Sequence, residues 1–215
     1  AITPAPEALE EADIPGINLD TEVKDADYIT AFVGSDNRNA GYVCGENLIE
    51  KKPDGGRIVI VESSSVNSVI ERITGFEEAI SNAGFEVVQR IDAGGDMSAV
   101  KSAVAEIIQS GEQIDAIMCG NDQMAEQVLA ALSEAGNSDP LVYSVDGSPV
   151  TKSALLDPGS PMEGIGAQSP INMGKTAVKV AAAVLNGTAF DRETYEETFF
   201  INRDNVEMYG TDGWQ

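Results

Sequence analysis

Five polar side chains follow runs of residues that predict strands, and together they could bind a small ligand. They comprise two carboxylates, two amides and one guanidinium: Asp20, Asn121, Asp146 and Gln168 come just after apolar runs, and Arg72 lies on the helix expected after another. Ligands of open parallel sheets bind outside the carboxyl ends of the strands, so these side chains are expected at one edge. Carboxylates accept hydrogen bonds from hydroxyl groups, a guanidinium donates them as a fork, and amides do both. The set predicts a site for a small, neutral, polyhydroxylated ligand.

Each of these residues also has an ordinary structural interpretation. An Asp or Asn at the end of a strand is commonly a helix N-cap or a turn residue. Arg72 alone is expected to pair with surface acids, because Glu71, Glu77 and Glu78 lie close to it in the sequence. The coincidence of all five residues at one predicted edge is what favours the binding site.

The composition excludes several classes of function. The 215 residues include 13 Lys and Arg, 36 Asp and Glu and no histidine, which gives a formal net charge of −23. Without histidine the chain has no Ser-His-Asp or Cys-His nucleophile pair and no His-ligated zinc, and we expect no catalytic residue, metal or other cofactor. The negative charge opposes binding to nucleic acid. No apolar run reaches the roughly 18 residues of a membrane span.

The two cysteines are too few for a disulfide scaffold. Cys44 and Cys119 each lie in an apolar stretch, where a free thiol behaves as a small buried hydrophobic group. The sequence leaves a bond between the two open.

The middle of the chain repeats one pattern. Strand-like runs at 58–62, 86–91, 115–119, 142–146 and 163–167 alternate with helical patterns that each carry one apolar stripe. Such alternation is typical of a parallel sheet that helices cover on both faces. Residues 57–168 therefore predict one complete five-stranded parallel α/β lobe.

The flanks predict a second lobe that is incomplete. Strands are expected at 17–20, 28–33 and 198–202 and a helix at 171–185, with crossings near 34–37, 168–170 and 202. This divides the chain into an incomplete lobe 1, residues 1–34 and 170–200, and a lobe 2, residues 35–169 and 201–215. Because so few strands make a poor sheet, we expect βα units to be missing ahead of Ala1. The first residues show no signal peptide, so either no export signal existed or this is not the native start.

Several motifs carry a resemblance to a known family. They are Asn18-Leu-Asp20, Val33-Gly-Ser-Asp-Asn37, Glu71-Arg-Ile-Thr-Gly-Phe76, Cys119-Gly-Asn-Asp-Gln-Met-Ala125, Val145-Asp-Gly-Ser-Pro149 and Ala167-Gln168. In this order and spacing the chain resembles the sugar-binding proteins of bacterial ABC importers, the group typified by ribose-binding protein. The resemblance extends over essentially the whole chain and implies the two-lobed type I periplasmic-binding-protein fold.

The resemblance also implies a function without covalent chemistry. In that family, the positions that match Asp20, Arg72, Asn121, Asp146 and Gln168 hydrogen-bond a sugar in a cleft between lobes that close about a hinge. A monosaccharide or sugar-like polyol would be captured outside the cytoplasm, by a periplasmic protein or cell-surface lipoprotein, and delivered to the membrane subunits of an ABC permease.

A different class of function shares the two lobes. The effector domains of lactose-repressor-family transcription regulators also sense small ligands and carry the Arg-x-x-Gly-aromatic motif, which here spans Arg72–Phe76. The charge of −23 opposes work beside DNA. An enzyme is the third alternative, but the chain has neither a phosphate-binding loop nor a nucleophile elbow.

Overall fold

The chain forms two units in the computed structural model, which describes residues 4–23, 26–94 and 96–214. Unit 1 contains the described residues up to Asp36 and residues 169–197, and unit 2 contains residues 37–168 and 198–214. The chain therefore crosses between the units after residues 36, 168 and 197. The sequence placed these crossings after residues 34, 169 and 200.

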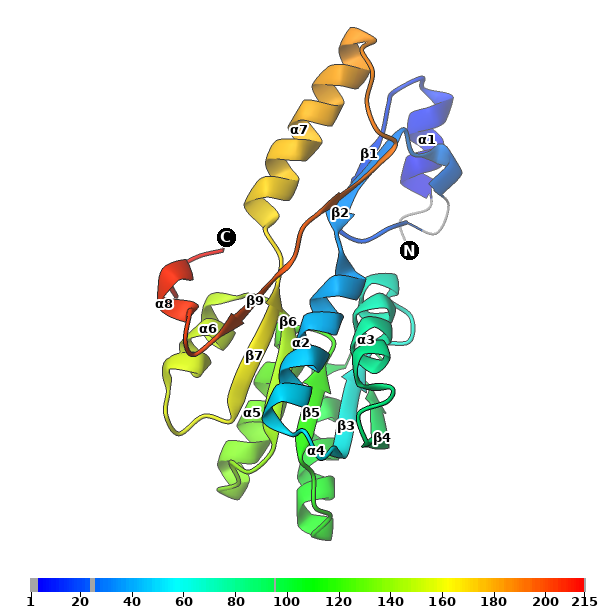
Figure 1. The fold of residues 1–215 in the computed structure, drawn as a ribbon. Helices are drawn as coiled ribbons and strands as arrows, with labels where there is room; N and C mark the ends of the chain where they lie inside the picture. The colour runs from blue at the N-terminus through cyan, green and yellow to red at the C-terminus, as the bar shows by residue number, and fades with distance from the viewer. Residues whose placement is uncertain (1–3, 24–25, 95, 215) are drawn as a thin grey trace. The chain divides into compact units, whose positions relative to one another are not determined.

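Unit 2 is built on a six-stranded sheet of order β4-β3-β5-β6-β7-β9 (Figure 1). The strands are β3 (Gly56–Glu62), β4 (Phe85–Asp92), β5 (Ala116–Cys119), β6 (Leu141–Asp146), β7 (Met162–Ala167) and β9 (Phe199–Asn202). The first five are parallel, and β9 pairs antiparallel with β7. The predicted five-stranded parallel sheet is thus confirmed, with a sixth strand added at its edge.

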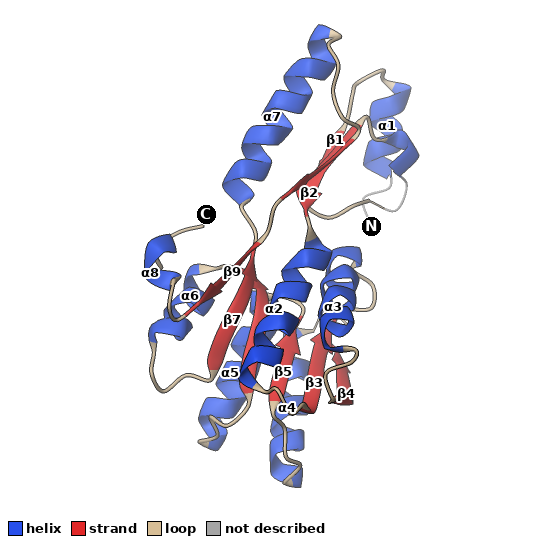
Figure 2. Cartoon of the chain, in the orientation of Figure 1, coloured by secondary structure: helices blue, strands red, loops and turns tan. Residues whose placement is uncertain are grey.

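Helices cover both faces of this sheet. The helices of unit 2 are α2 (Asn37–Lys51), α3 (Asn67–Ile80), α4 (Met97–Ser110), α5 (Asp122–Ala135), α6 (Pro149–Leu156) and α8 (Val206–Tyr209). Helices α2 and α3 lie in front of the sheet in Figure 2, with α4 and α5 behind it. Residues 58–61 of β3 and all of β5 are buried, which explains their unbroken apolar sequences, because strands covered on both faces have no polar side.

Helices α2 and α3 pack backbone to backbone. A Cβ atom added at Gly41 of α2 would lie 1.7 Å from the carbonyl oxygen of Arg72 on α3. In the opposite direction, a Cβ added at Gly75 of α3 would lie 1.9 Å from the carbonyl oxygen of Arg38 on α2. Each of the two positions therefore accepts only glycine. The close approach of the backbones places Arg72 of α3 beside the first turns of α2.

Unit 1 is smaller. Its elements are α1 (Pro4–Glu11), β1 (Ile17–Leu19), the 3-10 helix η1 (Ala26–Tyr28), β2 (Ala31–Ser35), α7 (Pro170–Asn186) and β8 (Glu193–Glu196). The sheet has the order β1-β2-β8 with both pairs parallel, and α7 packs on β1 and β2. Its core consists of Ala31, Val33, Met173 and Val180.

Two strand predictions are wrong in detail. The predicted strand 28–33 begins only at Ala31, opposite Ile17, because η1 occupies the residues through Tyr28. The strand at 198–202 was assigned to lobe 1, but it forms β9 in the sheet of unit 2, where Ile201 is fully buried. Apolar periodicity identifies a strand but does not say which sheet it joins.

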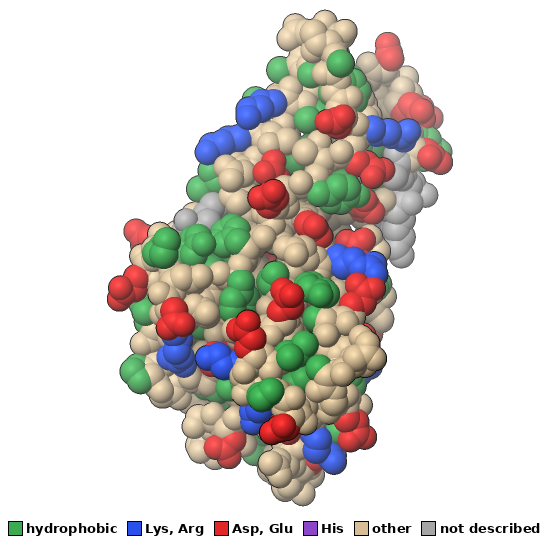
Figure 3. Space-filling model, viewed as in Figure 1, with side chains coloured by type: hydrophobic (Ala, Val, Ile, Leu, Met, Phe, Trp, Pro, Cys, Tyr) green, Lys and Arg blue, Asp and Glu red, His purple; other side chains and the backbone are tan. Residues whose placement is uncertain are grey.

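The surface carries the excess of acidic residues. Acidic side chains are scattered over the visible face in Figure 3, with Lys and Arg among them. Some form exposed ion pairs, such as Lys101 Nζ with Glu134 Oε1 at 2.6 Å. Of the helices in the described residues, none combines the length and the apolar character needed to cross a membrane.

Candidate ligand-binding site

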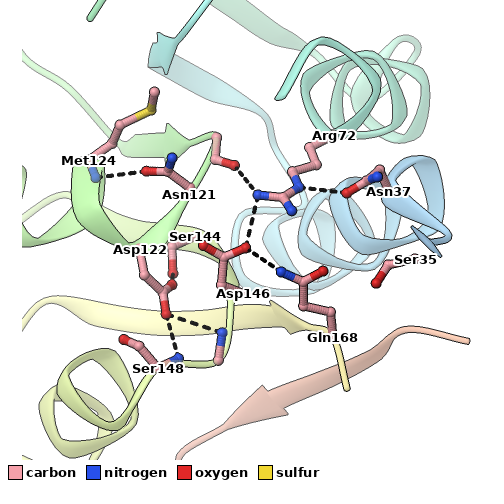
Figure 4. A network of polar contacts seen from close by, with 12 residues as sticks. Ser35, Asn37, Arg72, Asn121, Asp122, Met124, Ser144, Asp146, Ser148 and Gln168 are labelled. Atoms are coloured by element: carbon pink, nitrogen blue, oxygen red, sulfur yellow. Dashed lines mark hydrogen bonds and ion pairs between the residues drawn. The ribbon is translucent and has the colours of Figure 1, made fainter. Parts of the chain in front are cut away.

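Four of the five predicted residues lie in unit 2, beside the carboxyl ends of its strands (Figure 4). Asp146 is the last residue of β6, Gln168 follows β7, and Asn121 lies between β5 and α5. Arg72 reaches this edge from α3. The alternation of strands and helices in the sequence is what gathers residues that are up to 96 positions apart.

An ion pair between the buried Arg72 and the partly buried Asp146 lies at the centre of the site. Arg72 Nη1 is 2.9 Å from Asp146 Oδ1, and Arg72 as a whole is only 4% exposed. The guanidinium also donates from Nε to Asn37 Oδ1 at 2.8 Å and from Nη1 to the carbonyl oxygen of Gly120 at 3.0 Å. A buried charge persists only when it is paired and hydrogen-bonded in this way.

The interpretation of Arg72 as a surface partner of nearby acids is therefore wrong. Two of those acids pair with other arginines: Glu77 with Arg90, and Glu78 with Arg38. Arg72 instead points inward, toward Asn37 and Asp146, from the part of α3 that packs closely on α2.

Gln168 joins the same carboxylate. Its Nε2 donates to Asp146 Oδ1 at 2.8 Å, so the oxygen that forms the ion pair with Arg72 also accepts a hydrogen bond from Gln168. The backbone N–H of Gln168 also donates to the carbonyl oxygen of Asp146 at 3.0 Å. These contacts join the ends of β6 and β7 and hold the side chains of Asp146 and Gln168 together at the sheet edge.

Asn121 fulfils the N-cap interpretation. Its Oδ1 accepts a hydrogen bond from the backbone N–H of Met124 at 2.9 Å, which caps α5. The cap uses only the carbonyl oxygen of this amide, so the NH2 group can still donate to a ligand. A helix cap and a ligand contact are thus compatible at this position.

Asp20 lies in unit 1 rather than with the other four. It follows β1 with a φ of 74°, and its backbone N–H donates to the carbonyl oxygen of Val33 at 2.9 Å. This is the geometry of a turn residue, for which Asp is one of the tolerated types.

Two residues of the site escaped the sequence analysis. Asn37, the first residue of α2, is 7% exposed and accepts from Arg72. Asp122, the neighbour of Asn121, is 2% exposed and accepts hydrogen bonds from the segment around Asp146. Both stand in motifs quoted above, but each is the first residue of a helix, where Asn and Asp are ordinary, so the residue type alone did not indicate a role in the site.

The cysteines take no part in this site. Cys44 and Cys119 are buried, as expected, and both are free, which answers the question that the sequence left open. Burial raises the pKa of Cys44 to about 12 and also raises that of Cys119. Among the described residues, no group of three or more His, Cys, Asp or Glu side chains could hold a metal ion.

The arrangement suits an uncharged ligand with hydroxyl groups. The charges of Arg72 and Asp146 compensate each other, so an ionic ligand would disturb a neutral pair. Amide and carboxylate groups beside this pair offer both donors and acceptors, as a hydroxyl group requires.

Comparison with known proteins identifies a family. The sequence profile described as the periplasmic binding protein domain matches residues 1–189 of this chain. The ribose import binding protein RbsB of Salmonella typhimurium is 28% identical over 188 residues, which are 87% of this chain and 62% of that protein. The D-allose-binding periplasmic protein of Escherichia coli is 30% identical over 168 residues, 76% of this chain and 53% of that protein. The chain thus spans less than two thirds of these relatives.

Solved structures show the same fold. An ABC transporter solute binding protein from Bacillus halodurans with bound myo-inositol superposes with a TM-score of 0.84 and 28% identity, over 95% of this chain and 71% of that one. A galactofuranose binding protein superposes with a TM-score of 0.85 and 24% identity, over 97% and 73%. The fold expected from the motifs is confirmed.

Proposed function

Because the chain belongs to the periplasmic binding protein domain family, we propose that it binds a monosaccharide or a sugar-like polyol for an ABC importer. Its relatives include proteins named for ribose and allose, and a solved structure that is 28% identical holds myo-inositol. All three compounds are small, neutral and rich in hydroxyl groups, which is the ligand chemistry that the residues at the sheet edge favour.

One observation in the structure carries this proposal: the ion pair of the buried Arg72 with the partly buried Asp146, with Gln168 donating to the same carboxylate. A sugar hydroxyl can accept from the guanidinium and donate to the carboxylate at once. A stereoisomer that misplaces this hydroxyl would leave a buried polar group unpaired, at a cost of about 1–3 kcal/mol. The pair of Arg72 and Asp146 would therefore select among sugars by the orientation of their hydroxyl groups.

The remaining roles follow from the family. Asn121 would donate from its NH2 group, and Asp20 is a fifth proposed contact that rests on the resemblance alone. The protein would act in the periplasm or as a cell-surface lipoprotein and deliver its sugar to the membrane subunits of the importer. Binding and release, without covalent chemistry, are its whole proposed activity.

Thermal unfolding with a panel of D-ribose, D-allose, L-arabinose, D-galactose and myo-inositol tests the proposal. A compound present at 1,000 times its dissociation constant adds about 4 kcal/mol to the free energy of unfolding. For a chain of this length the midpoint would rise by roughly 8–16 °C. A cooperative transition that none of these compounds moves would contradict sugar binding by this chain.

Two variants then test the site assignment by calorimetry with the compound that gives the largest shift. Arg72→Ala and Asp146→Asn are each expected to weaken binding at least about tenfold, since each removes one charge of the ion pair and leaves the opposite charge uncompensated. Arg57→Ala is the matched control, because Arg57 is exposed and pairs with Glu112 away from the site. Unchanged affinity in both site variants would refute the assignment.

A further inference from the structure

We propose that Asp122 is a positioning residue: its buried carboxylate holds the turn after β6 in the one shape that presents Asp146 to Arg72 and Gln168. The inference rests on the proposed function for its meaning, because Asp146 matters as a sugar contact. The claim that Asp122 holds the turn concerns the chain without ligand, so it can be tested without any sugar.

The hydrogen bonds of Asp122 all come from one short segment. Oδ1 accepts from Ser144 Oγ at 2.6 Å, and Oδ2 accepts from Thr151 Oγ1 at 2.6 Å. Oδ2 also accepts from the backbone N–H groups of Gly147 at 3.1 Å and Ser148 at 2.6 Å. The four donors flank Asp146 on both sides, and Figure 4 shows Asp122 beside Ser144 and Ser148.

The turn needs such a partner because its backbone is unusual. Asp146 has a φ of 136° and Gly147 a φ of 95°, and residues other than glycine rarely adopt positive values. Strained conformations of this kind persist only where the surrounding structure enforces them. The two N–H groups that follow Asp146 would be left buried without an acceptor if the carboxylate of Asp122 were removed.

The charge of Asp122 suits this task better than a neutral acceptor would. Hydrogen bonds from backbone N–H groups to a carboxylate are shorter and about twice as strong as those to neutral oxygens. An asparagine could keep one oxygen facing Gly147 and Ser148, but it would hold the turn less firmly. An alanine would hold none of the four donors. Asp122→Asn should therefore let the side chain of Asp146 depart in part from its position beside Arg72 and Gln168, and Asp122→Ala should let it depart further.

The first experiment is nuclear magnetic resonance of the full chain without ligand. The side-chain amide of Gln168, assigned with Gln168→Glu, reports its hydrogen bond to Asp146, and Asp146→Ala defines the signal when that bond is lost. In Asp122→Ala the Gln168 signal should move to the position found in Asp146→Ala, and in Asp122→Asn it should move partway in the same direction. If the alanine variant does not fold, the asparagine variant alone decides the question.

Asp96→Ala is the matched control. Asp96 is a carboxylate of unit 2 at the start of α4, and like Asp122 it accepts from a backbone N–H and a hydroxyl, both of Ser98 in this case, but these contacts lie away from the turn. It should leave the Gln168 signal unchanged. A Gln168 signal at its original position in the folded Asp122 variants would overturn the proposal, since the turn would then hold Asp146 without help.

The second experiment links the turn to binding, with D-ribose and D-allose as the probes. Asp122→Ala should weaken binding at least about tenfold, yet cause no further loss when Asp146 is already alanine. An equal loss in both backgrounds would overturn the proposal, because Asp122 would then act independently of Asp146. If neither sugar binds the original chain, the proposed function fails for these sugars, and the Gln168 signal still decides the positioning role.

Discussion

Replacement of Gly41 by alanine would test whether the close packing of α2 on α3 sets the position of Arg72. The added Cβ would lie 1.7 Å from the carbonyl oxygen of Arg72 and 3.0 Å from the backbone nitrogen of Phe76. Both neighbours are backbone atoms in a helix, so no side chain can rotate away. The two helices would have to separate by about 1.5 Å at this point to restore van der Waals contact.

The expected cost follows from two opposing effects. Forcing an extra methyl group into a packed interior costs about 1–3 kcal/mol, and the approach to backbone atoms at Gly41 takes the upper part of that range, about 2–3 kcal/mol, while alanine regains about 1 kcal/mol over glycine inside a helix. The net loss of about 1–2 kcal/mol would lower the unfolding midpoint by roughly 2–8 °C. The same separation would stretch the bonds of Arg72 to Asn37 and Asp146, now 2.8 and 2.9 Å, and so weaken sugar binding at least about tenfold.

Differential scanning calorimetry and a sugar titration would measure both effects. Gly174→Ala is the matched control, because Gly174 also lies inside a helix, α7, but an added Cβ would meet nothing within 4 Å. This control should raise the midpoint by roughly 2–4 °C through helix propensity alone. If Gly41→Ala is as stable as Gly174→Ala and binds sugar normally, the glycine contact does not position Arg72.

Three further predictions concern unit 2 away from the site. Arg203→Ala should lower the free energy of urea unfolding by about 1–2 kcal/mol, because the guanidinium donates to four backbone carbonyls. Arg57→Ala, which removes an exposed ion pair, should change this free energy by less than about 0.5 kcal/mol. Equal effects of the two substitutions would contradict the structural role of Arg203. Cys44 and Cys119 should resist iodoacetamide at pH 8 in the folded chain and react in guanidinium chloride, since burial raises both pKa values; stoichiometric labelling of the folded chain would argue otherwise. Hydrogen bonds from the backbone N–H of Arg57 and the ammonium group of Lys52 lower the pKa of Asp115 below its ordinary 3.8. The stabilising contribution of this carboxylate is therefore complete above pH 3.8 and is lost as the pH falls through the lowered pKa. The difference in free energy of unfolding between the original chain and Asp115→Asn should close in acid, and a difference that stays constant with pH would exclude this linkage.

The buried strands of unit 2 were predictable because a strand that is covered on both faces has an uninterrupted apolar sequence. The run Ile58–Val61 has no polar residue, and neither does Ala116–Cys119, so each stands out among charged neighbours. Strand β8, by contrast, reads Glu-Thr-Tyr-Glu and is partly exposed, so no apolar pattern marked it. The destination of β9 was unpredictable for another reason: pairing with β7 is a long-range choice that local periodicity does not encode.

The candidate site was predictable where a side chain ends a strand or directly follows it. Asp146 and Gln168 meet that condition, and parallel topology then places them together. Asn37 and Asp122 act on other site residues instead, and their contacts depend on helix packing and on an unusual turn. Neither of these features has a sequence pattern that distinguishes it from an ordinary helix start.

The antiparallel strand β9 has a consequence for how the chain reaches its folded state. Until residues 199–202 arrive, β7 presents an unpaired strand edge, which is a template for association with other chains. The 29 residues of unit 1 between Ser169 and Glu197 must be synthesised before this edge can close. During synthesis, the nascent chain therefore exposes a sticky edge for several seconds at roughly 5–20 residues per second. Shielding of that edge until residues 199–202 arrive would therefore reduce association and raise the yield of folded protein.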